Sequence, residues 1–187
     1  MAIGKTYVDE LTTTLVKLGF FSKTEGDAIK QNFSDSDQAI FDSFLLEQGL
    51  IERDDLLRAL SIHYQVPSFD VVGYFFESAL LHQLPKDFLL RNAIIPLEVD
   101  ENMLIMIASE PDLSDLVVRI NEFVSYDIQF YVGIQEDITD AVKEFYDKAP
   151  TQEIPEDEDL REERLALRQE REEELEDIDN LSDDYYE

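Results

Sequence analysis

The chain has 187 residues, 44% of them hydrophobic, so it is long enough for one domain of about 150 residues with a tail, or for two small lobes. It contains no cysteine, which excludes disulfides, thiolate zinc sites and thiol nucleophiles. A formal net charge of −29 repels phosphate backbones and anionic lipid head groups, so we expect no direct binding of nucleic acid.

Residues 5–65 predict a helical lobe that contains a degenerate repeat. The segments 15–22 and 45–52 align with a period of 30 residues, and each reads as a helix, a Gly turn and a second helix. Gly19 and Gly49 occupy the position after a helix where the backbone is usually left-handed. Ser22 and Glu25 have the spacing of a capping box, which predicts that a helix begins there.

The rest of this lobe predicts a second helical hairpin. Ser34 can cap a helix that runs to about Gln48, and the apolar residues of the segment 56–60 mark the inner face of the next helix. Packing the two hairpins on each other would bury these apolar stripes. Pro67 ends the lobe, because proline disfavours helical geometry in the residue before it.

Residues 66–148 predict a small α/β lobe. Segments 93–99 and 103–108 are apolar runs of strand length, and residues 100–102 between them suit a hairpin turn. Segment 126–132 alternates apolar and polar residues, which is typical of a third strand.

Three helices are predicted around these strands. Pro85 suits the first position of one helix, Asp112 can cap another, and residues 135–148 have apolar side chains at helical spacing. The order β-β-α-β-α implies a small mixed three-stranded sheet with helices on one face, so the predicted fold class is α+β.

Residues 149–187 form an acidic tail. Residues 151–187 hold −13 of the net charge. Glu and Arg recur there at helical spacing without a sustained heptad, so we expect a partly helical or disordered segment.

Catalytic and metal-binding patterns were sought along the whole chain. Gly4-Lys5-Thr6 lacks the upstream Gly and the preceding strand of a P-loop. His63 and His82 lie on separate segments without metal-ligand spacing. We therefore expect no catalytic residue, no cofactor and no metal, and a chain that is not an enzyme.

The sequence also predicts where the protein is located. The N-terminus lacks the basic and then apolar pattern of a secretory signal, and the apolar runs are far shorter than a membrane span. We expect a cytoplasmic protein that associates with a membrane only through a partner.

Residues 45–146 resemble a known family in the order and spacing of several short motifs. These are Leu45-Leu46-Glu47-Gln48-Gly49-Leu50-Ile51, Leu84-Pro85-Lys86-Asp87-Phe88-Leu89, Ile94-Ile95-Pro96-Leu97, and Met103 to Pro111. The chain resembles the N-terminal domain of type II secretion and type IV pilus assembly ATPases, the GspE N-terminal-like or MshEN-like domain, standing alone without the ATPase motor. Residues 5–44 resemble it weakly, and the tail does not.

The resemblance implies a domain that docks a motor onto inner-membrane platform proteins, and in some members binds cyclic di-GMP. The binding repeat of those members has Arg-Leu-Gly before the turn Gly and a Gln after it. In the two copies of this chain, Glu10 and Ile40 stand at the Arg position. Thr12 and Asp42 stand at the Gly position, and Phe33 and His63 stand at the Gln position. A dianionic ligand would meet Glu10 and Asp42 where it needs a cation and bare backbone.

We therefore expect a non-catalytic protein–protein interaction module, an adaptor or regulator. Its partner would be an inner-membrane platform protein or a motor ATPase of a pilus or secretion system. The candidate partner-binding residues lie at the hairpin turns: Phe20, Phe21, Leu50 and Ile51. In adjacent aromatic pairs such as Phe20-Phe21 and Phe75-Phe76, one ring tends to face outward and could form a docking surface, but burial of both rings between the lobes is the favoured alternative.

Two alternatives remain open. One is a nucleotide sensor that binds a cyclic di-GMP-like ligand between the hairpins. The other is an acidic charge mimic that inhibits a basic protein, with binding that weakens as the salt concentration rises.

Overall fold

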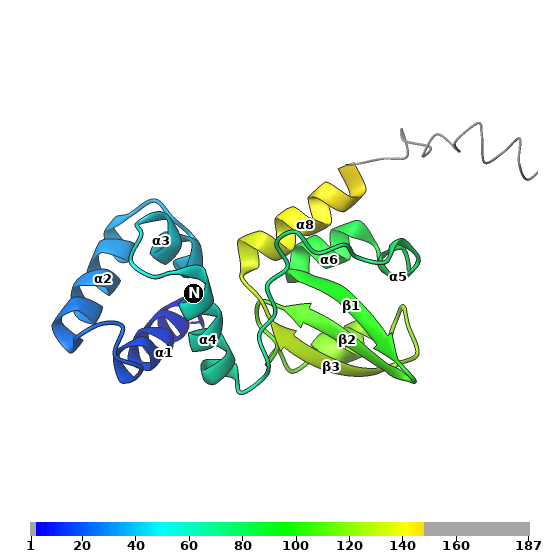
Figure 1. Cartoon of the computed structure of the whole chain (residues 1–187), viewed down its shortest axis with the longest axis horizontal. Helices are drawn as coiled ribbons and strands as arrows, with labels where there is room; N and C mark the ends of the chain where they lie inside the picture. The colour runs from blue at the N-terminus through cyan, green and yellow to red at the C-terminus, as the bar shows by residue number, and fades with distance from the viewer. Residues whose placement is uncertain (1–2, 148–187) are drawn as a thin grey trace, which may run out of the picture. The chain divides into compact units, whose positions relative to one another are not determined.

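The computed structural model describes residues 3–147, drawn in colour in Figure 1. The helical part comprises α1 (Ile3–Lys17), α2 (Lys23–Asp35), α3 (Phe41–Glu47) and α4 (Arg53–Tyr64). The α/β part comprises α5 (Ser78–Leu81), α6 (Lys86–Asn92), β1 (Ile94–Asp100), β2 (Met103–Ala108), α7 (Leu116–Ile120), β3 (Asp127–Val132) and α8 (Gln135–Asp147). The α+β class is confirmed, whereas the tail predicted for 149–187 lies outside the described residues.

The start of α2 confirms the predicted capping box. Ser22 is the N-cap, its hydroxyl accepts from the backbone N–H of Glu25 at 3.3 Å, and the Glu25 carboxylate accepts from the backbone N–H of Ser22 at 2.7 Å. Two of the four N–H groups that a helix leaves without an internal partner are thereby satisfied.

The cap predicted at Ser34 is wrong, because α2 continues through that residue to Asp35. Ser36 ends the helix instead, and both its hydroxyl and its backbone N–H donate to the carbonyl of Phe33. The next helix, α3, begins after Ile40 without a side-chain cap. Apolar packing therefore fixes α3, whose Phe41, Phe44 and Leu45 are buried.

The sheet has the order β1-β2-β3, with β1 antiparallel and β3 parallel to β2. The hairpin predicted at residues 100–102 is present, and Glu101 in it has a φ of 53°. The register shifts between Pro96 and Glu98, so Leu97 is an extra residue in β1. A bulge fits this position, because proline has no N–H to donate to the ladder.

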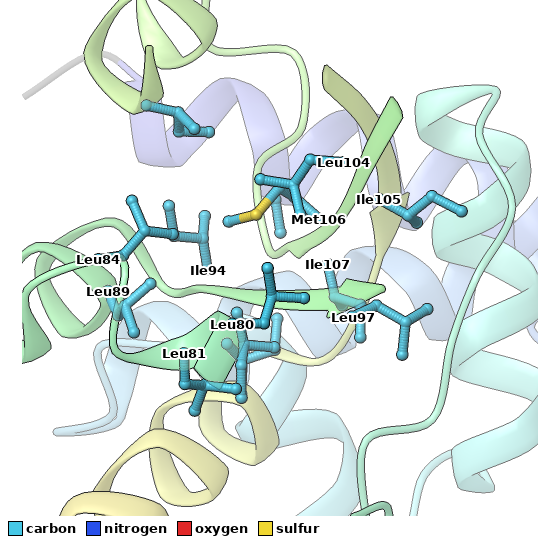
Figure 2. Close-up of a cluster of buried hydrophobic side chains, with 14 of the residues drawn as sticks. Leu80, Leu81, Leu84, Leu89, Ile94, Leu97, Leu104, Ile105, Met106 and Ile107 are labelled. Atoms are coloured by element: carbon cyan, nitrogen blue, oxygen red, sulfur yellow. The ribbon is translucent and has the colours of Figure 1, made fainter. Parts of the chain in front are cut away.

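Both faces of the central strand are covered. Leu104 through Ala108 are all buried, and successive residues of a strand point to opposite faces. Helices α5, α6 and α8 pack against the sheet (Figure 1), and Figure 2 shows side chains of α5, α6 and both antiparallel strands converging in this core.

The segment after β2 differs from its prediction. Asp112 caps no helix, and α7 begins only after Asp115, which makes no side-chain capping bond. Leu116, Ile120 and Val124 still reach the core of the α/β part. The helix predicted here is therefore present but begins later and is shorter than a cap at Asp112 implied.

The segment after α4 is hydrogen-bonded to β3, and the helical and α/β parts of the described chain are joined by side-chain contacts. The backbone N–H of Val132 donates to Pro67 O at 2.8 Å, and that of Phe69 donates to Val132 O at 2.9 Å. Val132 and Ile134 are buried in the same cluster as the apolar residues of the helical part. Arg53 of α4 pairs with Asp137 of α8.

Candidate functional site

The two Gly turns have the same backbone geometry. Gly19 and Gly49 have φ values of 83° and 62°, which confirms the predicted left-handed conformation. In the first turn the N–H of Phe20 donates to Leu15 O, and in the second that of Leu50 donates to Leu45 O. Both turns are Schellman motifs, so the repeat seen in the sequence is a repeat in structure at these positions.

The four candidate partner-binding residues at these turns differ in how much surface they present. Leu50 is 37% exposed, whereas Ile51 is 9% exposed and belongs to the core of the helical part. Phe20 and Phe21 are half-buried and pack against the same core. Of the four, Leu50 offers a partner the most accessible surface, and a binding role for any of them stays a prediction.

A more exposed apolar segment lies at residues 72–75, just before α5. Phe75 is 97% exposed, and Val72 and Tyr74 are 59% and 42% exposed. Phe76 is half-buried against the core of the α/β part. The outward-facing member of this aromatic pair is therefore Phe75, whereas neither ring of Phe20-Phe21 is fully exposed.

Backbone contacts fix the shape of this segment. Val71 is buried at its base, and the N–H of Tyr74 donates to Val71 O at 3.2 Å. The N–H of Val72 donates to the Asp70 carboxylate at 3.0 Å, and Gly73 supplies a φ of 73°. We call residues 72–75 the apolar loop.

A cavity of about 690 Å³ lies between α1, the start of α3, the end of α4 and the segment that follows β2. Five of the six residues that the sequence analysis aligned with the Arg, Gly and Gln positions of the binding repeat line it: Glu10, Phe33, Ile40, Asp42 and His63. The sixth, Thr12, is buried and donates to the carbonyl of Val8 at 2.6 Å. Residues from the first copy of the repeat, such as Glu10, and from the second copy, such as His63, thus meet at one site.

The electrostatic centre of the cavity is a hydrogen-bonded pair. The Tyr7 hydroxyl donates to Asp42 Oδ1 at 2.6 Å, and Asp42 is only 4% exposed. Burial raises the pKa of Asp42 to about 6, while the hydrogen bond from Tyr7 acts in the opposite direction. Asp42 is therefore largely ionised at neutral pH although it is buried.

The carboxylates around the cavity make it negative, and this affects its two tyrosines. Burial raises the pKa of Tyr7 and of Tyr64, and nearby carboxylates raise both further, Asp42 foremost for Tyr7 and Asp112 for Tyr64. Both phenols therefore stay protonated and can donate hydrogen bonds. The sequence alone did not indicate that Tyr7, Tyr64 and Asp112 line this cavity, because only the fold brings them next to the repeat positions.

Between residues 3 and 147, no helix is long and apolar enough to cross a membrane. Over the same range, no three His, Asp or Glu side chains come together in a way that could hold a metal ion. The carboxylates of the cavity therefore lack the geometry of a metal site.

Residues 76–152 match the family model of the MshEN domain. A comparison with curated proteins finds no match to the chain.

Two solved structures have a similar fold. A structure of MshE with cdg has a TM-score of 0.57 at 18% identity, covering 73% of this chain and 98% of that chain. A structure of the N-terminal domain of XpsE has a TM-score of 0.51 at 14% identity, covering 72% of this chain and 92% of that chain. The fold is therefore shared by both. Residues 76–152 are similar to the MshEN domain, and the resemblance to the N-terminal domains of secretion and pilus ATPases is confirmed.

Proposed function

We propose that this protein is a docking module that binds a protein of a pilus or secretion system through the apolar loop. The observation that carries the proposal is Phe75, a large aromatic side chain that is 97% exposed beside an otherwise well-packed core. Aromatic residues dominate the binding energy of protein interfaces, so an exposed one on a soluble acidic surface favours a partner.

The apolar loop is suited to this role because it is already ordered. Two hydrogen bonds from its backbone N–H groups fix its path, and the ring of Tyr74 lies edge-on to Phe69 and Phe76 at centroid distances of 5.2 and 4.8 Å. Side chains that are held in place lose little conformational entropy on binding. The backbone that carries Phe75 is therefore held in place before a partner binds, which lowers the entropic cost of binding.

The class of partner is inferred from the family. An MshEN domain and the fold of the MshE and XpsE domains favour an inner-membrane platform protein or a motor ATPase as the binding partner. The role would be that of an adaptor or regulator without catalysis. The turn residues Phe20, Phe21, Leu50 and Ile51 remain candidates for a second contact.

Affinity purification from the native cell tests the proposal, at low and high salt and with and without residues 150–187. Phe75→Ser should abolish recovery of a platform protein or motor ATPase. Val118→Ser is the matched control, because Val118 is also an exposed apolar residue, at 66%, and it lies outside the loop. Recovery that depends only on the tail, and falls with salt, would favour the acidic charge mimic instead.

Nucleotide sensing is the second candidate. It is favoured by the structure of MshE with cdg and by the cavity at the corresponding positions of this chain. The lining opposes it, because Glu10 and Asp42 would repel a phosphodiester. A thermal-shift titration with cyclic di-GMP decides, since a ligand that binds only the folded state raises the unfolding temperature.

A further inference from the structure

The lining of the cavity has an excess of negative charge. Glu10, Asp42, Glu110 and Asp112 contribute carboxylates from three separate segments. Among the described residues that line it there is no Lys or Arg, and His63 is the one basic side chain. A ligand that enters must therefore tolerate or neutralise this charge.

Asp42 gives the cavity a specific anchoring point. The Tyr7 hydroxyl binds Oδ1, and within residues 3–147 no ion pair and no second side-chain hydrogen bond reaches this carboxylate. A buried carboxylate with one neutral partner is costly, because burial removes the water that would otherwise solvate it. A cationic donor on Oδ2 would recover that free energy.

Aromatic rings stand beside this carboxylate. Tyr7 lies 5.8 Å from His63 and 6.4 Å from Tyr64, and His63 lies 4.6 Å from Tyr64, measured between ring centroids. All three residues line the cavity. The face of a tyrosine ring attracts a cation, and planar cations also stack on it.

We propose that this cavity binds a guanidinium group, with Asp42 as its carboxylate partner and the Tyr7 and Tyr64 rings as its walls. A guanidinium ion is planar and weakly hydrated, and its donors match a carboxylate, so it suits a partly apolar and acidic site better than an ammonium ion does. Metal cations fit less well, because the described acidic residues lack a three-ligand arrangement.

The chemistry of this site is opposite to that expected from the family. Positions that hold Arg and Gly in members that bind a dianionic nucleotide hold Glu10, Ile40 and Asp42 here, and these residues line the same cavity. Ile40, Phe33 and Leu113 also offer apolar surface for the methylene groups of an arginine-like ligand. The site does not depend on the apolar loop or on a docking partner.

Isothermal titration calorimetry of the full chain with Nα-acetyl-arginine methylamide tests the proposal. We expect saturable binding that weakens by at least about tenfold in Asp42→Asn, which keeps an acceptor for Tyr7 but removes the charge. Glu110→Gln should weaken it less, because Glu110 is exposed. Glu122→Gln, which removes an equal charge outside the cavity, should leave it unchanged.

The neutral isostere Nα-acetyl-citrulline methylamide provides the decisive comparison. Binding of the citrulline compound as tight as that of the arginine compound would overturn the proposal, as would an equal loss in Asp42→Asn and Glu122→Gln. Free arginine separates two sources of the group. Weaker binding of free arginine assigns the site to an arginine side chain in a polypeptide, and equal binding assigns it to a small guanidinium compound.

Discussion

At the scale of single residues, Asp42 has the most informative environment. Its pKa lies near 6 in the folded chain and near 4 in an unfolded one, so the folded state binds more protons between these values. The free energy of unfolding therefore falls as the pH rises from about 4 to about 6. Above that range the full cost of burying the ionised carboxylate is present. This is opposite to the usual carboxylate, which is stabilised in its charged form.

Asp42→Asn is expected to raise the free energy of unfolding by about 1–3 kcal/mol at pH 7.5. The gain should shrink as the pH is lowered to 5, because the wild-type carboxyl then takes up a proton. Tyr7, Glu10, His63, Tyr64, Glu110 and Asp112 face the same cavity and are present in both proteins, so the difference isolates Asp42. The measurement is urea denaturation, since guanidinium is itself a candidate ligand. A gain in the free energy of unfolding that does not change with pH would contradict the raised pKa of Asp42.

At the scale of elements, the N-termini of some helices are stabilised by a capping side chain, and those of others by packing. Ser22→Ala should lower the free energy of unfolding by about 0.5–2 kcal/mol, because it removes the side-chain half of the capping box. Ser34→Ala is the matched control, since Ser34 is exposed within α2. Urea denaturation of both variants checks this, and equal losses would show that the box is not stabilising.

These elements also show how far the sequence could be read. The strands were predicted because apolar runs such as 103–108 are long enough for a strand and too short for a buried helix. Ser34 and Asp112 were misread as caps because Ser and Asp are also common away from caps, and only the geometry of the helix end distinguishes the two.

The cavity could be predicted only in part. Family positions such as Glu10 and His63 pointed to it, but Tyr7 and Tyr64 enter it through the packing of α1 on α4. The loop after β2 closes it with Glu110 and Asp112, and nothing local in the sequence signals that approach. The exposure of Phe75 likewise could not be predicted, because the adjacent Phe76 is just as apolar and packs against the core.

At the scale of the whole molecule, the contact between the helical and α/β parts of the described chain includes a polar pair. Arg53 of α4 binds Asp137 of α8, whose side chain is 15% exposed, and a second carboxylate, Asp70, lies 4.0 Å from Arg53. Burial raises the pKa of Asp137, and the charge of Arg53 counteracts this. Removing the cation would therefore leave a partly buried carboxylate unpaired.

Arg53→Met should lower the free energy of unfolding by about 1–3 kcal/mol at pH 7.5. Adding Asp137→Asn should recover part of this loss, because the unpaired charge is then removed as well. A double-mutant cycle in urea measures the coupling. Strictly additive losses would mean that the pair contributes no coupling between the two parts.

The most direct test of the docking function is photo-crosslinking in the native cell, with a photoreactive amino acid placed at position 75 and, as a control, at position 98. Glu98 is exposed on β1 and lies outside the apolar loop. We expect a crosslink from position 75, and none from position 98, to an inner-membrane platform protein or a motor ATPase. Crosslinks to the same proteins from both positions, or none from position 75, would contradict docking through Phe75.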